Sequence, residues 1–395
     1  MYKRIDYKTI TDRMNEPRKF IQVIMGPRQI GKTTVVKQVL KDWEKPYLFF
    51  SADNVPATQT NWISDCWQSA RAKMKTQNLS EIIIVIDEIQ KINDWSSVVK
   101  KEWDYDTFND LNIKAVMLGS SRVMLEKGLS ESMMGRFEEI RMSHWSFPEM
   151  QEAFGTSLEQ YIYFGGYPGA AHLVENQERW EQYINSSIID ATINKDILLD
   201  TPIGKPALMR QTFELGAAYS GNILSLTKML GSLKDAGNTV TLSNYINLLN
   251  DSGLLTGLQK FSIDLSRRRA SIPKFQVYNN ALRNVYSDCG YPDILTRPEK
   301  WGHVFESAVG AHILNYAFKE RYEVNYWREG NFEVDFVLRK KNAVAAIEVK
   351  SNNRTTNSGL QEFVKKFKPK SSLVVGNGGL PAEDFFRINP ADLLK

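Results

Sequence analysis

The stretch IMGPRQIGKTTVV, residues 24–36, places two glycines, a lysine and two threonines between apolar runs. The spacing G-x-x-x-x-G-K-[ST] of a phosphate-binding loop is met by four residues: Gly26, Gly31, Lys32 and Thr33. FIQVIM before the loop predicts a buried strand, and TTVVKQVLKDW after it predicts an amphipathic helix. Backbone N–H groups of such a loop, together with the positive end of the helix, face an anion. The stretch therefore predicts an α/β fold with a phosphate-binding turn.

The loop is expected to hold ATP. We predict nine nucleotide-binding residues: Gly26, Pro27, Arg28, Gln29, Ile30, Gly31, Lys32, Thr33 and Thr34. Lys32 would reach the β- and γ-phosphates, and the Thr33 hydroxyl would coordinate Mg²⁺. The alternative is a glycine-rich turn without a ligand, which the strand and helix on either side disfavour.

A second apolar run ends in two acids. Residues 82–86, within SEIIIVIDEIQKI, predict a central parallel strand that is buried on both faces. Asp87 and Glu88 then lie at its carboxyl end, where α/β sheets bind ligands. We predict that Asp87 holds Mg²⁺ and that Glu88 activates the water that attacks the γ-phosphate. The alternative is a solvated acidic turn.

Two further candidates follow the next predicted strands. IKAVMLGSS, residues 113–121, predicts a strand that ends at Ser120 and Ser121, either of which is a candidate contact to the γ-phosphate or to the attacking water. Arg136 precedes a predicted strand at residues 137–142 and is a candidate charge-stabilising arginine, within the chain or across a subunit boundary. The alternatives are a strand-terminal turn and an ordinary surface arginine.

Residues 1 to about 200 resemble the AAA-type P-loop ATPases of prokaryotes. The matching pieces are GPRQIGKTT, IDEIQKINDW, LGSS, GRFEEI, SFPEM and YIYFGGYPGA. The resemblance implies an ATP-hydrolysing core followed by a helical lid and a C-terminal domain of uncharacterised function. It also implies that an oligomer is possible.

The middle of the chain predicts mainly helices. Residues 207 to about 265 are expected to form three short helices and a hairpin that together resemble a winged helix. Thr241 or Ser243 is the expected cap of the third helix, and Gly253 is its expected stop. The exposed positions of this helix offer asparagines but no Lys or Arg, although the arginine run at 267–269 lies nearby. DNA reading is one interpretation; a packing module that couples the ATPase to the rest of the chain is the other.

The last third of the chain predicts a helix at 302–318, an edge strand at 322–327 and a hairpin, FEVDFVL and AVAAIEVK. The helix carries Glu306, the first hairpin strand carries Asp335, and the second carries Glu348 and Lys350 on one face. This order resembles the PD-(D/E)-x-K nuclease fold, with Val334 where that motif has its proline.

The resemblance implies a second candidate site. Asp335 and Glu348 would chelate Mg²⁺ with the Val349 carbonyl, Glu306 would complete the metal shell, and Lys350 would stabilise charge in the reaction. One alternative is a hairpin with ordinary cross-strand salt bridges. Another is a fold that binds its partner without cutting it.

Composition sets the remaining expectations. The 395 residues are 42% hydrophobic and 24% charged with a net charge of +4, as in an ordinary globular protein. Neither a signal peptide nor a spanning segment is expected, which predicts a cytoplasmic protein that does not engage a membrane. Cys66 and Cys289 suggest no disulfide framework.

Four segments are predicted: an ATPase core (1–145), a helical lid and linker (146–205), a winged-helix-like module (206–275) and an α/β restriction-endonuclease-like domain (276–395). The leading hypothesis is an ATPase whose nucleotide state, ATP or ADP, controls a nuclease-like, DNA-directed C-terminal domain. The alternative is an ATP-dependent switch whose inactive C-terminal domain binds protein or nucleic acid.

Overall fold

The computed structural model describes residues 2–120, 129, 133–198, 203–233, 237–264, 271–351 and 358–395. Ser121 and the arginine run at 267–269 lie outside the described residues. The chain is a mixed α/β protein that divides into two compact units, Met1–Met142 and Ser143–Lys395. The first unit is close to the predicted ATPase core, which was expected to end at 145.

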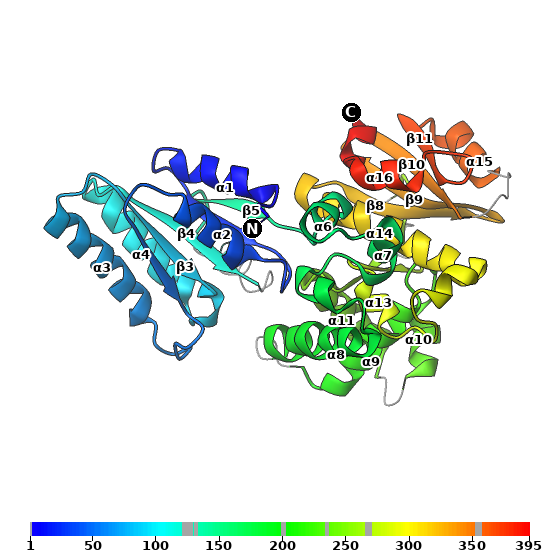
Figure 1. Cartoon of the computed structure of the whole chain (residues 1–395), viewed down its shortest axis with the longest axis horizontal. Helices are drawn as coiled ribbons and strands as arrows, with labels where there is room; N and C mark the ends of the chain where they lie inside the picture. Colours follow the sequence, from blue (N-terminus) through cyan, green and yellow to red (C-terminus); the bar gives the residue numbers. More distant parts are fainter. Residues whose placement is uncertain are drawn as a thin grey trace. The chain divides into compact units, whose positions relative to one another are not determined.

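The first unit is built on a five-stranded, fully parallel sheet with the order β2-β3-β4-β1-β5 (Figure 1). The four strands predicted in this part are confirmed, and β1, β3 and β4 are buried along their whole length. Its elements are α1 (Asp6–Asn15), β1 (Ile21–Met25), α2 (Lys32–Lys41), β2 (Tyr47–Ser51), α3 (Asn61–Gln77), β3 (Ile82–Asp87), α4 (Trp95–Phe108), β4 (Ile113–Gly119) and β5 (Phe137–Arg141).

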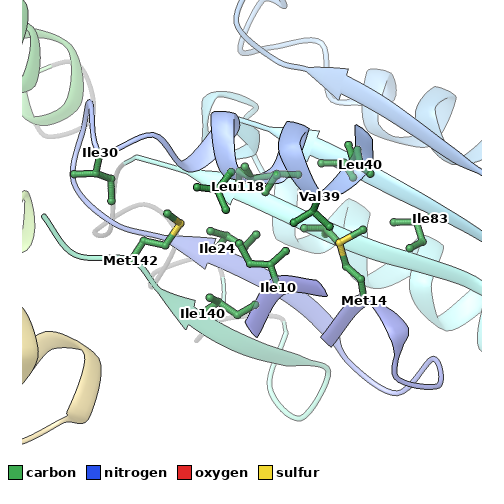
Figure 2. Packing of buried hydrophobic residues seen from close by; sticks show 14 residues of the cluster. Ile10, Met14, Ile24, Ile30, Val39, Leu40, Ile83, Leu118, Ile140 and Met142 are labelled. Carbon is green, nitrogen blue, oxygen red and sulfur yellow. The ribbon is translucent and has the colours of Figure 1, made fainter. Parts of the chain in front are cut away.

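Helices α1 and α2 cover one face of this sheet, and α3 packs against β3 and against α4 (Figure 1). The apolar spacing in α2 turns Val35, Val36, Val39 and Leu40 inward. Figure 2 shows Val39 and Leu40 among residues of α1, the sheet and Met142, and Val35 and Val36 belong to the same buried cluster. The cluster fixes the helix that follows the phosphate loop against the strand that precedes it.

The second unit contains a mixed six-stranded sheet with the order β11-β10-β9-β8-β6-β7. Its elements are α6 (Phe147–Phe154), α7 (Leu158–Phe164), α8 (Gln177–Tyr183), α9 (Pro206–Ala218), α10 (Leu226–Ser232), α11 (Thr239–Asp251), β6 (Leu255–Lys260), β7 (Lys274–Val277), α13 (Ala281–Asn284), α14 (Pro298–Glu320), β8 (Glu323–Glu329), β9 (Phe332–Lys340), β10 (Ala343–Lys350), α15 (Ser358–Phe367), β11 (Ser371–Gly376) and α16 (Ala382–Arg387).

Helices α14 and α15 pack against this sheet. The long helix α14 buries a run of residues along its middle, because it contacts β7, β8 and β10. On α15, Leu360 and Phe363 pack with Trp327, Val334 and Val337 in an apolar cluster that also includes Phe261, next to β6. The predicted helix and hairpin of the last third are therefore confirmed as elements.

Three details differ from the sequence predictions. Strand β8 lies inside the sheet, not at its edge, because β6 pairs with it in parallel. The cap of α11 is Asn238, whose Oδ1 accepts from Thr241 N at 2.8 Å, because the helix begins earlier than predicted. Gly253 follows α11 with a φ of 71°, as the stop signal predicted.

The expected boundary at 275 lies within β7, which is hydrogen-bonded to β6 in the sheet that also holds β8 to β11. The helices expected to form a winged helix are thus attached to the same sheet as the expected nuclease-like strands. None of the helices in the described part of the chain is both long and apolar enough to span a bilayer.

Candidate functional site

The phosphate loop connects β1 to α2 in a conformation that needs its glycines. Gly31 caps α2 with a φ of 87°, in the left-handed region that favours glycine. A Cβ on Gly26 would lie 2.1 Å from the carbonyl oxygen of Met142, so no side chain fits there. The Lys32 ammonium donates to the carbonyls of Gly26 and Pro27 at 2.9 and 2.8 Å. The lysine is therefore folded into the curve of the loop, where an incoming phosphate would meet it.

The carboxyl end of β3, which carries Asp87, contacts the start of α2 directly. Thr33 Oγ1 donates to Asp87 Oδ2 at 2.8 Å, which joins the start of α2 to the carboxyl end of β3. Burial raises the pKa of Asp87, and the charge of Glu88 adds to the rise. A hydroxyl and a buried carboxylate in contact are ligands that suit Mg²⁺, so these residues fit the predicted metal.

Glu88 is held by two neighbours. Its Oε2 accepts from Ser120 Oγ at 3.0 Å and from Gln90 Nε2 at 2.7 Å. Its backbone φ of 54° is left-handed, which is strained for a residue with a side chain. Gln90 is buried, and its Oε1 has no hydrogen-bond partner among the described residues. Sequence reasoning missed Gln90, whose only signal was its place two residues after the acid pair.

Arg136 lies just before β5 and makes a two-point contact with Asp104 of α4. The Nε and Nη2 atoms lie 2.7 and 3.0 Å from the two carboxylate oxygens. Both residues belong to the first unit. The charge-stabilising role predicted for Arg136 remains a prediction.

The four residues of the second candidate site come together in the second unit. Asp335 on β9 accepts from the Val349 amide of β10 at 2.7 Å. Lys350 donates to Glu348 Oε1 at 2.6 Å, so the two side chains share one face of β10 as predicted. Glu306 of α14 lies beside Asp335, because one ammonium contacts both carboxylates.

That ammonium belongs to Lys274 of β7, which sequence reasoning did not single out. Lys274 Nζ lies 2.7 Å from Glu306 Oε1, 3.6 Å from Asp335 Oδ1 and 3.3 Å from the Asp335 carbonyl. The residue has 0% exposure. We call Lys274, Glu306, Asp335, Glu348 and Lys350 the acid cluster. In the described part of the chain no group of three or more His, Cys, Asp or Glu is arranged to hold a metal ion.

Burial dominates the protonation of the acid cluster. It raises the pKa of Glu306 to about 7 and that of Glu348 to about 7, and the charge of Asp335 contributes to both shifts. Burial would by itself lower the pKa of Lys274, but the charges of Glu306 and Asp335 outweigh it and raise that pKa. Three carboxylates thus share two ammonium groups, and the excess carboxylate takes up a proton near neutrality.

This protonation predicts a pH-dependent effect of Glu348→Gln. The pKa of Glu348 in the folded state, about 7, lies above its ordinary value of 4.5, so the proton stabilises the folded state. That contribution is complete below the ordinary pKa and is lost as the pH rises through about 7. The charged groups that act on Glu348 are Asp335 on β9, Lys350 beside it and Lys274 on β7.

Glutamine does not titrate. From pH 5 to pH 8, the free energy of unfolding of Glu348→Gln should therefore rise by roughly 1–3 kcal/mol relative to that of the wild type. Urea unfolding at both pH values measures the difference. The exposed Glu152, changed to Gln on α6, is the control and should show no such trend. An equal pH dependence of the two variants would contradict the burial of this proton.

Comparisons with known proteins agree with the first unit and leave the second open. Residues 18–151 match the model of a family described as AAA domain. Residues 155–293 match a domain of unknown function (DUF8612), and residues 301–390 match another (DUF4143).

Relatives cover most of the chain at low identity. An uncharacterised protein of Haemophilus influenzae is 23% identical over 350 residues, which are 84% of this chain and 82% of the relative. An uncharacterised protein of Methanocaldococcus jannaschii is 22% identical over 344 residues, 82% of this chain and 73% of the relative.

Solved structures are more distant. The RuvB Holliday junction branch migration motor of Thermotoga maritima matches with a TM-score of 0.35 at 15% identity, over 64% of this chain and 86% of that one. A variant of it matches with the same TM-score at 14% identity. This likeness is too weak to support a functional argument. The match to the AAA domain spans the phosphate loop, Asp87 and Glu88, so this part of the chain is similar to AAA domains, which supports ATP binding.

Proposed function

We propose that the first unit binds and hydrolyses ATP. The observation that carries the proposal is the direct contact between Thr33 and Asp87, with the Lys32 ammonium folded into the same loop. Two motifs 54 residues apart in sequence thereby form one polar site at the carboxyl ends of parallel strands. The match of residues 18–151 to an AAA domain supports it.

Each residue then has a task. The loop amides and Lys32 bind the phosphates, and Thr33 and Asp87 would hold Mg²⁺. When bound, Mg²⁺ would neutralise charge on the phosphate oxygens. Glu88 accepts the proton of the attacking water, and Ser120 and Gln90 keep its carboxylate turned to the site.

Glu88→Gln separates binding from hydrolysis. The variant should retain ATP binding, because Lys32 and the loop are unchanged, and should lose hydrolysis by about 100-fold or more, because the amide cannot accept the proton. Phosphate release and nucleotide titration measure the two properties. Glu44→Gln, at an exposed position just beyond α2, is the matched control. Wild-type turnover by Glu88→Gln would refute the assigned base.

For the second unit we propose a module that binds DNA or a protein partner under control of the nucleotide state, without cutting. The competing function is Mg²⁺-dependent DNA cleavage at Asp335, Glu348 and Lys350. The contacts of Lys274 favour the non-cleaving module, because its ammonium already engages Glu306 and Asp335. Reading of DNA bases by α11 has less support, since Asn244 and Asn247 are exposed on it without a basic residue in the helix. A cytoplasmic location and an oligomer belong to the same proposal.

A further inference from the structure

We propose that Lys274 is the resident cation of the acid cluster and takes the place of a divalent metal ion. The inference rests on the non-cleaving function proposed for the second unit, and it is independent of ATP hydrolysis. It assigns a structural and electrostatic task to a lysine that lies on β7, at the end of the sheet opposite β11.

Lys274 cannot turn away from the cluster. Its side chain is fully buried, its neighbour Phe275 is also buried, and its ammonium lies 4.9 Å from the centre of the Phe336 ring. A buried ammonium without a partner costs several kcal/mol, so the fold must surround it with negative charge. Glu306 at 2.7 Å and Asp335 at 3.6 Å provide that charge.

The cluster's acceptor atoms are also largely engaged. Asp335 Oδ1 faces Lys274, and its Oδ2 accepts the Val349 amide at 2.7 Å. Glu348 Oε1 accepts from Lys350 at 2.6 Å, and its buried Oε2 has no hydrogen-bond partner among the residues that the structure describes. Mg²⁺ needs about six oxygen ligands at about 2.1 Å, and the Lys274 ammonium stands between two of the acids that would supply them.

Charge balance leads to the same conclusion. A nuclease-type metal site needs an excess of negative charge before the ion enters. Here the ammonium groups of Lys274 and Lys350 face three carboxylates, which leaves an excess of one negative charge. A divalent ion would have to displace the Lys274 ammonium.

The test removes the Lys274 ammonium from the acid cluster. Lys274→Met keeps the apolar stem over Phe336 and removes the ammonium, so the three acids should accept a divalent ion. Binding of Mn²⁺ to the full chain, without nucleotide, is followed by loss of the free-ion electron paramagnetic resonance signal. We expect one additional Mn²⁺ in Lys274→Met with a Kd of about 1 mM or tighter, and a rise in melting temperature of roughly 3–5 °C with Mn²⁺.

Matched variants decide the site. Lys274→Met combined with Asp335→Asn should lose the additional Mn²⁺. This loss would show that the ion binds at the acid cluster and not at the phosphate loop. Wild-type protein that binds Mn²⁺ in an Asp335-dependent manner would overturn the proposal, whether or not the lysine variant folds. So would Lys274→Met that folds and binds no more Mn²⁺ than the wild type.

DNA cutting separates this inference from the proposed function. Wild-type protein with Mg²⁺ or Mn²⁺ should cut neither single-stranded nor double-stranded DNA. Cutting that Asp335→Asn abolishes would overturn both the inference and the non-cleaving function. Asp335-dependent Mn²⁺ binding without cutting would overturn the inference alone.

Discussion

Lys32→Ala should lower ATP turnover by about 100-fold or more and weaken nucleotide binding. A single charged donor that stabilises the transferred phosphoryl group contributes a rate factor of this size. Lys32 is only 6% exposed, and its ammonium donates to the carbonyls of Gly26 and Pro27. Alanine removes the positive charge and leaves those carbonyls facing the phosphate oxygens. Phosphate release at saturating ATP and calorimetric titration with ATP measure both effects.

The matched control lies on the same helix. Lys41 is exposed in the last turn of α2, so Lys41→Ala should retain wild-type turnover. Melting curves of both variants check that the first unit stays folded. Unchanged ATP binding and turnover in Lys32→Ala would show that the nucleotide is held elsewhere, and the proposed function of the first unit would fail.

Glu306→Leu should destabilise the second unit by about 3–5 kcal/mol, the cost of leaving a buried charge without its close partner. The 2.7 Å contact from Lys274 would be lost, and the ammonium would keep only Asp335 at 3.6 Å. Urea unfolding at pH 7 measures the change.

Rescue distinguishes charge from packing. Adding Lys274→Met to Glu306→Leu removes the uncompensated ammonium and should recover most of the lost stability. Glu299→Leu, at an exposed position in the first turn of α14, should change stability by less than about 0.5 kcal/mol. If the double variant is no more stable than Glu306→Leu alone, Lys274 does not depend on this carboxylate.

The first unit was predictable because its signals are local. Gly31 needs a left-handed φ, Lys32 follows it, and Asp87 ends an uninterrupted apolar strand; each requirement is written in a few neighbouring residues. Gln90 was missed because a glutamine in a polar turn carries no signal of burial.

The second unit was less predictable because its key contacts are distant in sequence. Lys274 pairs with Glu306 and Asp335, 32 and 61 residues further along the chain. A single lysine in IPKFQV reads as an exposed residue, since lysines are rarely buried. The pairing of β6 with β8 is equally non-local, so β8 read as an edge. The order of helix and hairpin could be predicted from the sequence. The position of the Lys274 ammonium among their acids could not.

The pairing of β6 with β8 determines whether the two domains of unknown function can be separated. The two domains of unknown function meet near residue 300, yet β6 and β7 come from the first and complete the sheet formed by the second. Without the earlier segment, the later one would present a bare β8 flank to other chains. Its acids would also lose the lysine that neutralises them. Recombination between these two segments would therefore divide a single sheet. We expect the two domains to occur together in the same chain.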